Sequence, residues 1–395
     1  MLPDYYEFQH STKLLSGKLA LENIPMELHM LGARCPMVLS DQVLFQIGTL
    51  KTVCDAVQAD GILIGAVYHE IPADSSSAVV NEIAELYRRS GCDSLVAVGG
   101  GSVLDTAKGV RMLLSQQAED IMELLGCEIL SCGRHIPFVA VPTTSGTGSE
   151  STLVAVIRNA VSGMKMEFIS YYLQPDVTVL DVRMTLTLPP KTTASTGLDA
   201  LCHAIEACTC LQRNPLSEAY GTAAIRMIGQ YLKRAVKNGR DEEARLGLAN
   251  ASTMAGAAFS NSMVGMVHAI GHALGGVCHV PHGDAMTILL PWCMEYNMEK
   301  LSDDYGELLL YLAGPETYAA TRKEERGRAM ADQVRALSGE LHDLCGVPVT
   351  LKEAGVKRED FEAVAQAAIN DGAMIVNPVK VDKSDVIAVL ERAYE

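Results

Sequence analysis

The stretch "LVAVGGGSVLDTAKG", residues 95–109, joins an apolar run to a helical pattern through three consecutive glycines. The run predicts a buried strand, and the pattern that follows predicts a helix over 103–116. Consecutive glycines let a phosphate approach the backbone closely, and a helix N-terminus adds unpaired N–H groups. The motif is not GxGxxG, because Leu104 stands where the third glycine would be. We therefore expect a pyrophosphate-binding turn, with a plain strand-to-helix turn as the alternative.

Similar apolar runs, rich in β-branched residues, recur along the first half of the chain. All of them except the run 61–67 end in Gly, Pro or Asp, and helical patterns such as 75–90 lie between several of them. This alternation is typical of a parallel sheet that helices bury on both faces. The expected strands are "PMVLSD" (36–41), "GILIGAV" (61–67), "SLVAVGG" (94–100), "PFVAVP" (137–142) and "VTVLD" (177–181).

The strand signal stops near residue 190, and helical patterns follow to the end of the chain. "PLSEAYGTAAIRMIGQYLKRAVKNG" (215–239) predicts a helix with a proline near its start and a glycine past its end. A chain of 395 residues exceeds one ordinary core, and "LPPKTT" (188–193) marks the change. The sequence predicts an α/β N-terminal domain with a Rossmann-like parallel sheet over 1–188, followed by an all-α domain over 189–395.

Composition excludes several classes of protein. The formal net charge of −16 argues against a nucleic-acid partner or an anionic membrane surface. The apolar stretch 254–277 contains Ser260, His268 and His272, which favours buried helices over a membrane span. Eleven cysteines without a CxxC, and an N-terminus without a signal-peptide pattern, fit reduced thiols in a cytoplasmic protein.

A second loop, "VPTTSGTGSE" (141–150), follows another expected strand. Its hydroxyl groups, including those of Thr143 and Thr144, suit ribose and phosphate oxygens, although such clusters are also ordinary loop material. Open α/β sheets bind ligands at the carboxyl ends of their strands. The two loops together therefore predict a nucleotide site at that edge.

The segment "GLDALCHAIEA" (197–207) carries Asp199 and His203 four residues apart. On a helix these side chains lie one turn apart on one face. A simple salt bridge explains that spacing, but the apolar surroundings make an unpaired Asp199 costly and favour a cation as its partner.

The segment "HAIGHALGGVCHVPHGD" (268–284) holds four of the ten histidines. His268 and His272 are one helical turn apart, but Ala269 stands where a zinc protease of the HExxH type needs glutamate. Pro281 separates His279 from His282 and predicts the end of the first helix. Together with Asp199 and His203, these imidazoles suit divalent iron, zinc, nickel or cobalt better than Mg²⁺ or Ca²⁺.

The order of these motifs resembles the iron-containing (group III) alcohol dehydrogenase family over nearly the whole chain. The resemblance rests on GGGS–x₂–D–x₂–K (99–108), PTTSGTGSE (142–150), GLDALCHAIEA (197–207) and HAIGHALGG…PHG (268–283). It implies a nucleotide-binding domain, a helical domain that holds a metal, and a cofactor cleft between them.

The resemblance also implies roles for individual residues. The metal ligands would be Asp199, His203, His268 and His282, and His272 would lie near the substrate as the catalytic proton carrier. Phe259 and Val264 match pocket-lining positions, and His279 matches no role. The cofactor contacts would be Asp41, Gly99, Gly100, Gly101, Ser102, Thr143, Thr144, Thr152 and Lys165.

These roles imply a metal-dependent dehydrogenase for a small primary alcohol or aldehyde. Asp41 would repel a 2′-phosphate, so NAD is expected rather than NADP; Fe²⁺ is the expected metal, with Zn²⁺ as the alternative. A homo-oligomer, a dimer or a multiple of one, is expected from the resemblance. The segment "EIPADSSS" (70–77) departs from the family's "PNP"-type turn, so the resemblance assigns no adenine-side contacts to it.

Three alternatives share some of these features. One is an NAD-retaining reaction on the same scaffold, either a transhydrogenase or a relative of dehydroquinate synthase. Another is a polyol phosphate dehydrogenase, for which the sequence shows no obvious phosphate-binding cluster of Arg and Lys. The third is a metal-binding protein without turnover, against which the intact cofactor loops argue.

Overall fold

The computed structural model describes residues 3–125 and 133–395, which form two compact units. One unit spans Gln9–Thr187, and the other combines Leu188–Glu395 with the N-terminal residues up to Phe8. Residues 3–8 thus group with the second unit, where the ring of Phe8 stacks on Tyr220 at 5.5 Å between centroids. The ranges 1–188 and 189–395 remain a proposal for the domains.

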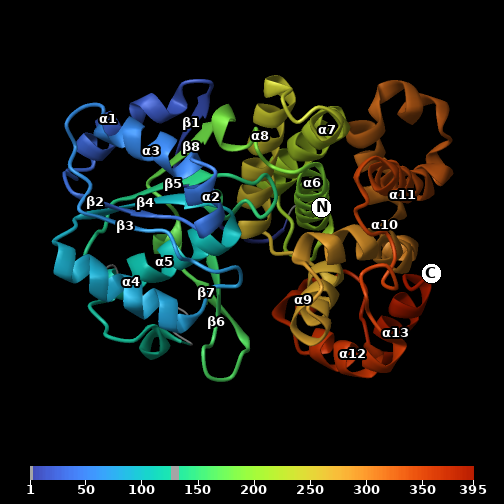
Figure 1. Ribbon diagram of the computed structural model, residues 1–395. Coiled ribbons are helices and arrows are strands. Elements are labelled where there is room, and N and C mark those ends of the chain that lie inside the picture. The colour runs from blue at the N-terminus through green and yellow to red at the C-terminus, as the bar shows by residue number, and fades with distance from the viewer. Residues whose placement is uncertain (1–2, 126–132) are drawn as a thin grey trace. The chain divides into compact units, whose positions relative to one another are not determined.

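The first unit is built around a six-stranded parallel sheet with the order β1-β8-β5-β4-β2-β3 (Figure 1). This sheet confirms the predicted fold class. Its strands are β1 (Lys13–Gly17), β2 (Pro36–Leu39), β3 (Ala66–Tyr68), β4 (Ser94–Gly99), β5 (Phe138–Pro142) and β8 (Val177–Asp181).

Helices cover both faces of this sheet, as the apolar runs predict. In β4, Leu95 and Ala97 enter one apolar core, whereas Val96 and Val98 enter the other, because successive side chains of a strand point to opposite faces. In Figure 1, α1 and α3 lie above the sheet and α4 and α5 below it. The helices of this unit are α1 (Ile24–Met30), α2 (Gln42–Gln46), α3 (Thr49–Gln58), α4 (Ser77–Ser90) and α5 (Gly101–Gln116).

Three strands were not expected from the sequence. β1 lies at one edge of the sheet and is largely exposed, so its sequence KLLSG lacks the continuous apolar run of a central strand. β6 (Val154–Arg158) and β7 (Lys165–Ile169) form a separate antiparallel hairpin. The alternate residues Ala155 and Ile157 of this hairpin are buried in the core shared with α4 and α5.

The second unit is helical throughout its described residues. Its one large apolar core is shared by α6 (Pro190–Thr209), α7 (Pro215–Lys237), α8 (Glu242–Ser260), α9 (Met266–Cys278), α10 (His282–Ala320), α11 (Arg326–Cys345), α12 (Phe361–Ile369) and α13 (Lys383–Arg392). The range given for α10 contains two helices, which are separated by a break at Gly314, where the φ of 87° is not helical.

The apolar stretch 254–277 is divided between α8 and α9, with Met263 in a left-handed conformation between them. Among the described residues, no helix combines the length and apolar character needed to cross a membrane.

Candidate metal centre and active site

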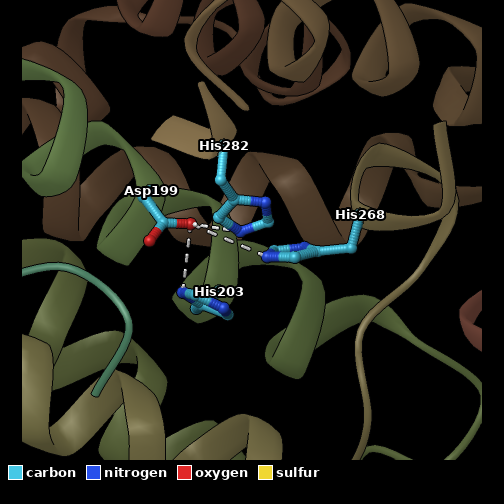
Figure 2. A group of neighbouring side chains, drawn as sticks. All are labelled: Asp199, His203, His268 and His282. Carbon is cyan, nitrogen blue, oxygen red and sulfur yellow. Dashed lines mark ion pairs between the residues drawn. The ribbon is translucent and has the colours of Figure 1, made fainter. Parts of the chain in front are cut away.

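The four residues predicted as metal ligands come together in the second unit (Figure 2). Asp199 and His203 lie one turn apart on α6, His268 lies in the first turn of α9, and His282 begins α10. Asp199 Oδ1 lies 3.5 Å from His203 Nδ1, 3.8 Å from His268 Nε2 and 3.4 Å from His282 Nε2. One donor atom from each side chain lies within 4.8 Å of the others.

Three of these donor atoms are buried without a hydrogen-bond partner: Asp199 Oδ1, His203 Nδ1 and His268 Nε2. Buried polar atoms are nearly always hydrogen-bonded, because an unpaired one costs about 1–3 kcal/mol. Atoms that converge on one point without partners are the arrangement that a bound cation satisfies. One carboxylate and three imidazoles suit Fe²⁺ or Zn²⁺.

Electrostatics favour the metal-binding form of three of the four proposed ligands, Asp199, His203 and His282. Burial alone would raise the pKa of Asp199, but the imidazoles of His203 and His282 hold it well below its usual value. Burial lowers the pKa of His203 to about 3 and also lowers the pKa of His282. At neutral pH the carboxylate is therefore ionised and both imidazoles keep a lone pair.

His268 has a second carboxylate partner that the sequence did not predict. Its Nδ1 lies 2.5 Å from Oε2 of Glu206, a buried residue on α6. Burial alone would lower the pKa of His268, but its contacts with Asp199 and Glu206 raise it to about 9. Glu206 lies inside the motif 197–207, where a glutamate among apolar residues was the available signal.

His272 follows His268 by one turn on α9 and is more exposed. Its Nδ1 lies 2.9 Å from Oδ2 of Asp371, and its ring stacks on His282 at 5.5 Å between centroids. Asp371 also caps the short 3₁₀ helix Gly372–Val376 through the N–H of Ala373. Asp371 is about one hundred residues away in sequence, and no local pattern connects it to His272.

The residues expected to line a pocket lie beside this cluster. The ring of Phe259 stacks on His203 at 4.3 Å between centroids, and Val264 packs in the same small apolar group as Phe259. His279 ends α9 in a left-handed conformation and is exposed. His279 is therefore the residue that terminates α9.

In the first unit, the two predicted loops meet at the carboxyl ends of β4 and β5. Gly99 pairs with Pro142 in the sheet, and the N–H of Thr143 donates to the carbonyl of Gly99 at 3.0 Å. A Cβ on Gly100 would lie 3.2 Å from Thr144, and a Cβ on Gly101 would lie 2.9 Å from Thr147. The glycines therefore let the second loop approach the first turn of α5.

The remaining residues expected to contact the cofactor also lie in the first unit. Asp41 caps α2 by accepting the N–H of Leu44 at 2.9 Å, and Thr152 Oγ1 accepts from Lys108 at 2.7 Å. Lys165 pairs with Asp74 at 3.0 Å. The hydroxyl of Ser102 accepts the N–H of Asp74. The segment 70–77, which differs from the family's usual turn, therefore contacts both Ser102 and Lys165, two residues expected to bind the cofactor.

Two charged residues of α5, the buried Lys108 and the partly buried Asp105, connect this helix to the second loop. Lys108 Nζ donates to Thr152 Oγ1 and to the carbonyl of Val154, both at 2.7 Å. One turn earlier, Asp105 accepts from Ser149 Oγ at 2.6 Å and from a backbone N–H of β6. The motif at 99–108 contains both residues, but their contacts follow from the fold.

Comparison with known proteins agrees with the resemblance seen in the motifs. Residues 11–182 match the family "Iron-containing alcohol dehydrogenase", and residues 193–394 match the "Fe-containing alcohol dehydrogenase family, C-terminal". The chain is 35% identical to the probable alcohol dehydrogenase EutG of Salmonella typhimurium, over 94% of this chain and 91% of that protein.

Solved structures give the same result. The alcohol dehydrogenase from Oenococcus oeni matches with a TM-score of 0.92 and 31% identity, over 99% of this chain and 100% of that one. Sulfoacetaldehyde reductase from Bifidobacterium kashiwanohense in complex with NAD⁺ matches with a TM-score of 0.86 and 25% identity, over 99% of both chains. The chain therefore belongs to the iron-containing alcohol dehydrogenase family of oxidoreductases.

Proposed function

We propose that the protein is an NAD-linked alcohol dehydrogenase, or aldehyde reductase, that works with a divalent metal held by Asp199, His203, His268 and His282. The observation that carries this proposal is the convergence of three buried, unpartnered donor atoms on one point. Fe²⁺ is the proposed metal, since the donor set accepts it and the family is named for iron; Zn²⁺ suits the same donors.

When bound, the divalent cation supplies a Lewis acid for the substrate oxygen, and nicotinamide supplies or takes the hydride. The chain's own residues orient and desolvate the reacting groups. Phe259 covers one face of His203, and the apolar group around Val264 borders the cluster. A site of this kind suits a small primary alcohol or aldehyde.

His272 is the proposed proton carrier. Asp371 holds Nδ1 of His272, so the other ring nitrogen, Nε2, is the atom that exchanges a proton with the substrate hydroxyl or with water. The stacking of His272 on His282 keeps this ring beside the metal ligands. His272 is partly exposed, which allows the proton to reach solvent.

NAD is the proposed cofactor, bound by Gly99–Ser102 with Thr143, Thr144, Thr152 and Lys165. The close approach of the two loops at the start of α5 supports this assignment, because a helix N-terminus next to glycines favours a pyrophosphate. The NAD⁺ complex of the Bifidobacterium relative supports the choice of cofactor. Asp41, at the end of β2, would disfavour a 2′-phosphate.

The test is metal analysis of anaerobically purified protein, followed by NADH oxidation with a panel of short aldehydes. The proposal predicts a divalent metal in equal amount to the chain and NADH oxidation by a single aldehyde without a second acceptor. Turnover by metal-free protein would contradict the metal assignment. A requirement for a second acceptor would instead show an NAD-retaining reaction.

A further inference from the structure

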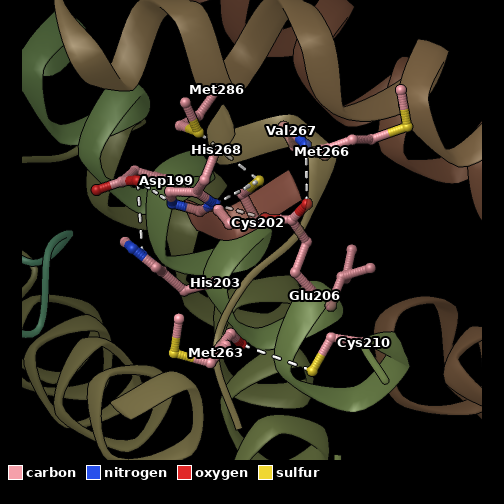
Figure 3. A network of polar contacts seen from close by, with 12 residues as sticks. Asp199, Cys202, His203, Glu206, Cys210, Met263, Met266, Val267, His268 and Met286 are labelled. Carbon is pink, nitrogen blue, oxygen red and sulfur yellow. Dashed lines mark hydrogen bonds and ion pairs between the residues drawn. The ribbon is translucent and has the colours of Figure 1, made fainter. Parts of the chain in front are cut away.

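Glu206 occupies a buried position directly behind one of the proposed metal ligands (Figure 3). It lies on α6, three residues after His203, and its carboxylate makes two contacts with the first turn of α9. Oε2 lies 2.5 Å from Nδ1 of His268, and Oε1 accepts the N–H of Val267 at 2.9 Å. Both oxygens are therefore engaged by groups that donate hydrogen bonds.

We propose that Glu206 is a positioning residue that sets the metal affinity of the centre, by fixing the ring of His268 and by supplying the second buried negative charge. The inference rests on the proposed function, since it concerns the same metal. A carboxylate that accepts from Nδ1–H leaves Nε2 of His268 as the ligand nitrogen, and such partners raise the basicity of the ring. In the structure Nε2 is the nitrogen that faces Asp199.

The charges of the buried groups support this role. Asp199 and Glu206 are both buried, and once the three imidazoles are neutral, as metal binding requires, the two carboxylates give the cluster two negative charges. A divalent cation neutralises this cluster, whereas an uncompensated charge in the interior is costly. With Asp199 as the sole carboxylate, a bound divalent ion would leave one positive charge buried.

A different interpretation would make Glu206 a ligand, because Cys202, Glu206 and His268 also bring donor atoms within 4.8 Å of one another. The contacts argue against it. The 2.5 Å separation between Glu206 Oε2 and His268 Nδ1 is that of a charge-assisted hydrogen bond and leaves no space for an ion between the two atoms. Cys202 Sγ is 3.9 Å from the same nitrogen, and burial raises the pKa of its thiol well above the usual value.

Asn377 provides a matched control, because it also binds the first turn of α9. The turn starts at Gly265, which has no capping side chain, and the N–H of Met266 donates to Asn377 Oδ1 at 3.3 Å. Asn377 also exchanges hydrogen bonds with Asn297 and is buried. It thus holds the backbone of α9, as Glu206 does, but it makes its hydrogen bonds to asparagine and to backbone groups and not to a histidine ring.

The experiment compares the Zn²⁺ affinity of the wild type, Glu206→Gln and Asn377→Ala by competition with a chelator. In glutamine one of the two acceptor oxygens is replaced by an NH₂ group that only donates, so one of the two contacts is lost and we expect Glu206→Gln to bind Zn²⁺ about 10–100-fold more weakly. Asn377→Ala should lower the melting temperature of the metal-free and the metal-loaded protein alike, with little change in affinity. Equal Zn²⁺ affinity in Glu206→Gln and wild type, or equal losses in both variants, would overturn the inference.

A second measurement uses the wild type and does not depend on whether a variant folds. In Zn²⁺-loaded protein labelled with ¹⁵N-histidine, His268 should carry a proton on Nδ1 and bind zinc through Nε2. An unprotonated Nδ1 would contradict the role of Glu206. A wild type that binds no Zn²⁺ or Fe²⁺ would instead refute the proposed function itself, so the two failures are distinguishable.

Discussion

For two histidines of α9, a carboxylate behind the ring decides which of the two ring nitrogens is available. Glu206 holds Nδ1 of His268, and Asp371 holds Nδ1 of His272. The two rings are one turn apart on α9, yet Nε2 of His268 faces Asp199, whereas His272 is partly exposed. The same residue type in the same helix is therefore suited to two different tasks.

The two histidines should separate in a mutational test. His268→Ala removes a proposed ligand, so we expect metal and activity to be lost together. His272→Ala keeps all four proposed ligands, and we expect it to retain metal but to lose about 100-fold or more in kcat, the range of a missing proton carrier. Metal content and steady-state rates of both variants check this, and a metal-free His272→Ala would show that the roles are assigned wrongly.

Asp41 should control the choice between the two nicotinamide cofactors. Asp41→Gly removes the carboxylate that would repel a 2′-phosphate, so kcat/KM with NADP should rise relative to NAD. Asp41 also caps α2, but glycine at such a position costs a few tenths of a kcal/mol, so the fold should survive. An unchanged ratio of the two kcat/KM values would count against the assignment.

At the scale of elements, the cofactor edge depends on how closely the second loop approaches α5. A Cβ on Gly101 would stand 2.9 Å from Thr147, and Gly100 is similarly confined by Thr144. Further along α5, Lys108 and Asp105 form hydrogen bonds with the segment 149–156, which follows the second loop. The loop is thus fixed at both ends by one helix.

Gly101→Ala should therefore weaken cofactor binding. The new methyl group pushes on Thr147 and displaces the second loop, so we expect a higher Kd for NADH in a fluorescence titration. Gly276→Ala is the matched control, since Gly276 lies in the last turn of α9 with nothing within 4 Å of a new Cβ. Alanine there should leave the Kd unchanged and add up to about 1 kcal/mol of stability. An unchanged Kd in Gly101→Ala would contradict the proposed cradle.

Lys108 predicts a pH dependence of stability. Burial lowers its pKa from 10.5 to about 8, although Asp105 and Glu150 oppose the shift. Between these two values the unfolded chain binds more protons than the folded one, so the stability contributed by Lys108 rises as pH rises through this window. The stability of the wild type relative to Lys108→Met should increase from below pH 8 towards pH 10 in urea unfolding. A difference that stays constant or falls with pH would contradict the lowered pKa of Lys108.

At the scale of the whole molecule, the sequence predicted those features whose signal is local. Buried strands such as β4 and β8 are predicted because they are continuous apolar runs. The spacing of Asp199 and His203 predicts one helical face, whereas their role as ligands is implied only by the family resemblance. The edge strand β1 and the hairpin β6–β7 were missed, since half-exposed strands lack such runs. Asp371 could not be found, because its contact with His272 spans 99 residues.

The central claim is that one divalent cation lies among Asp199, His203, His268 and His282. The most direct test is anomalous diffraction from crystals of the full chain grown without oxygen in the presence of Fe²⁺ or Zn²⁺. We predict one strong anomalous peak within bonding distance of Asp199 Oδ1, His203 Nδ1 and the Nε2 atoms of His268 and His282. A peak at Cys202 and Glu206, or none in this cluster, would contradict the account.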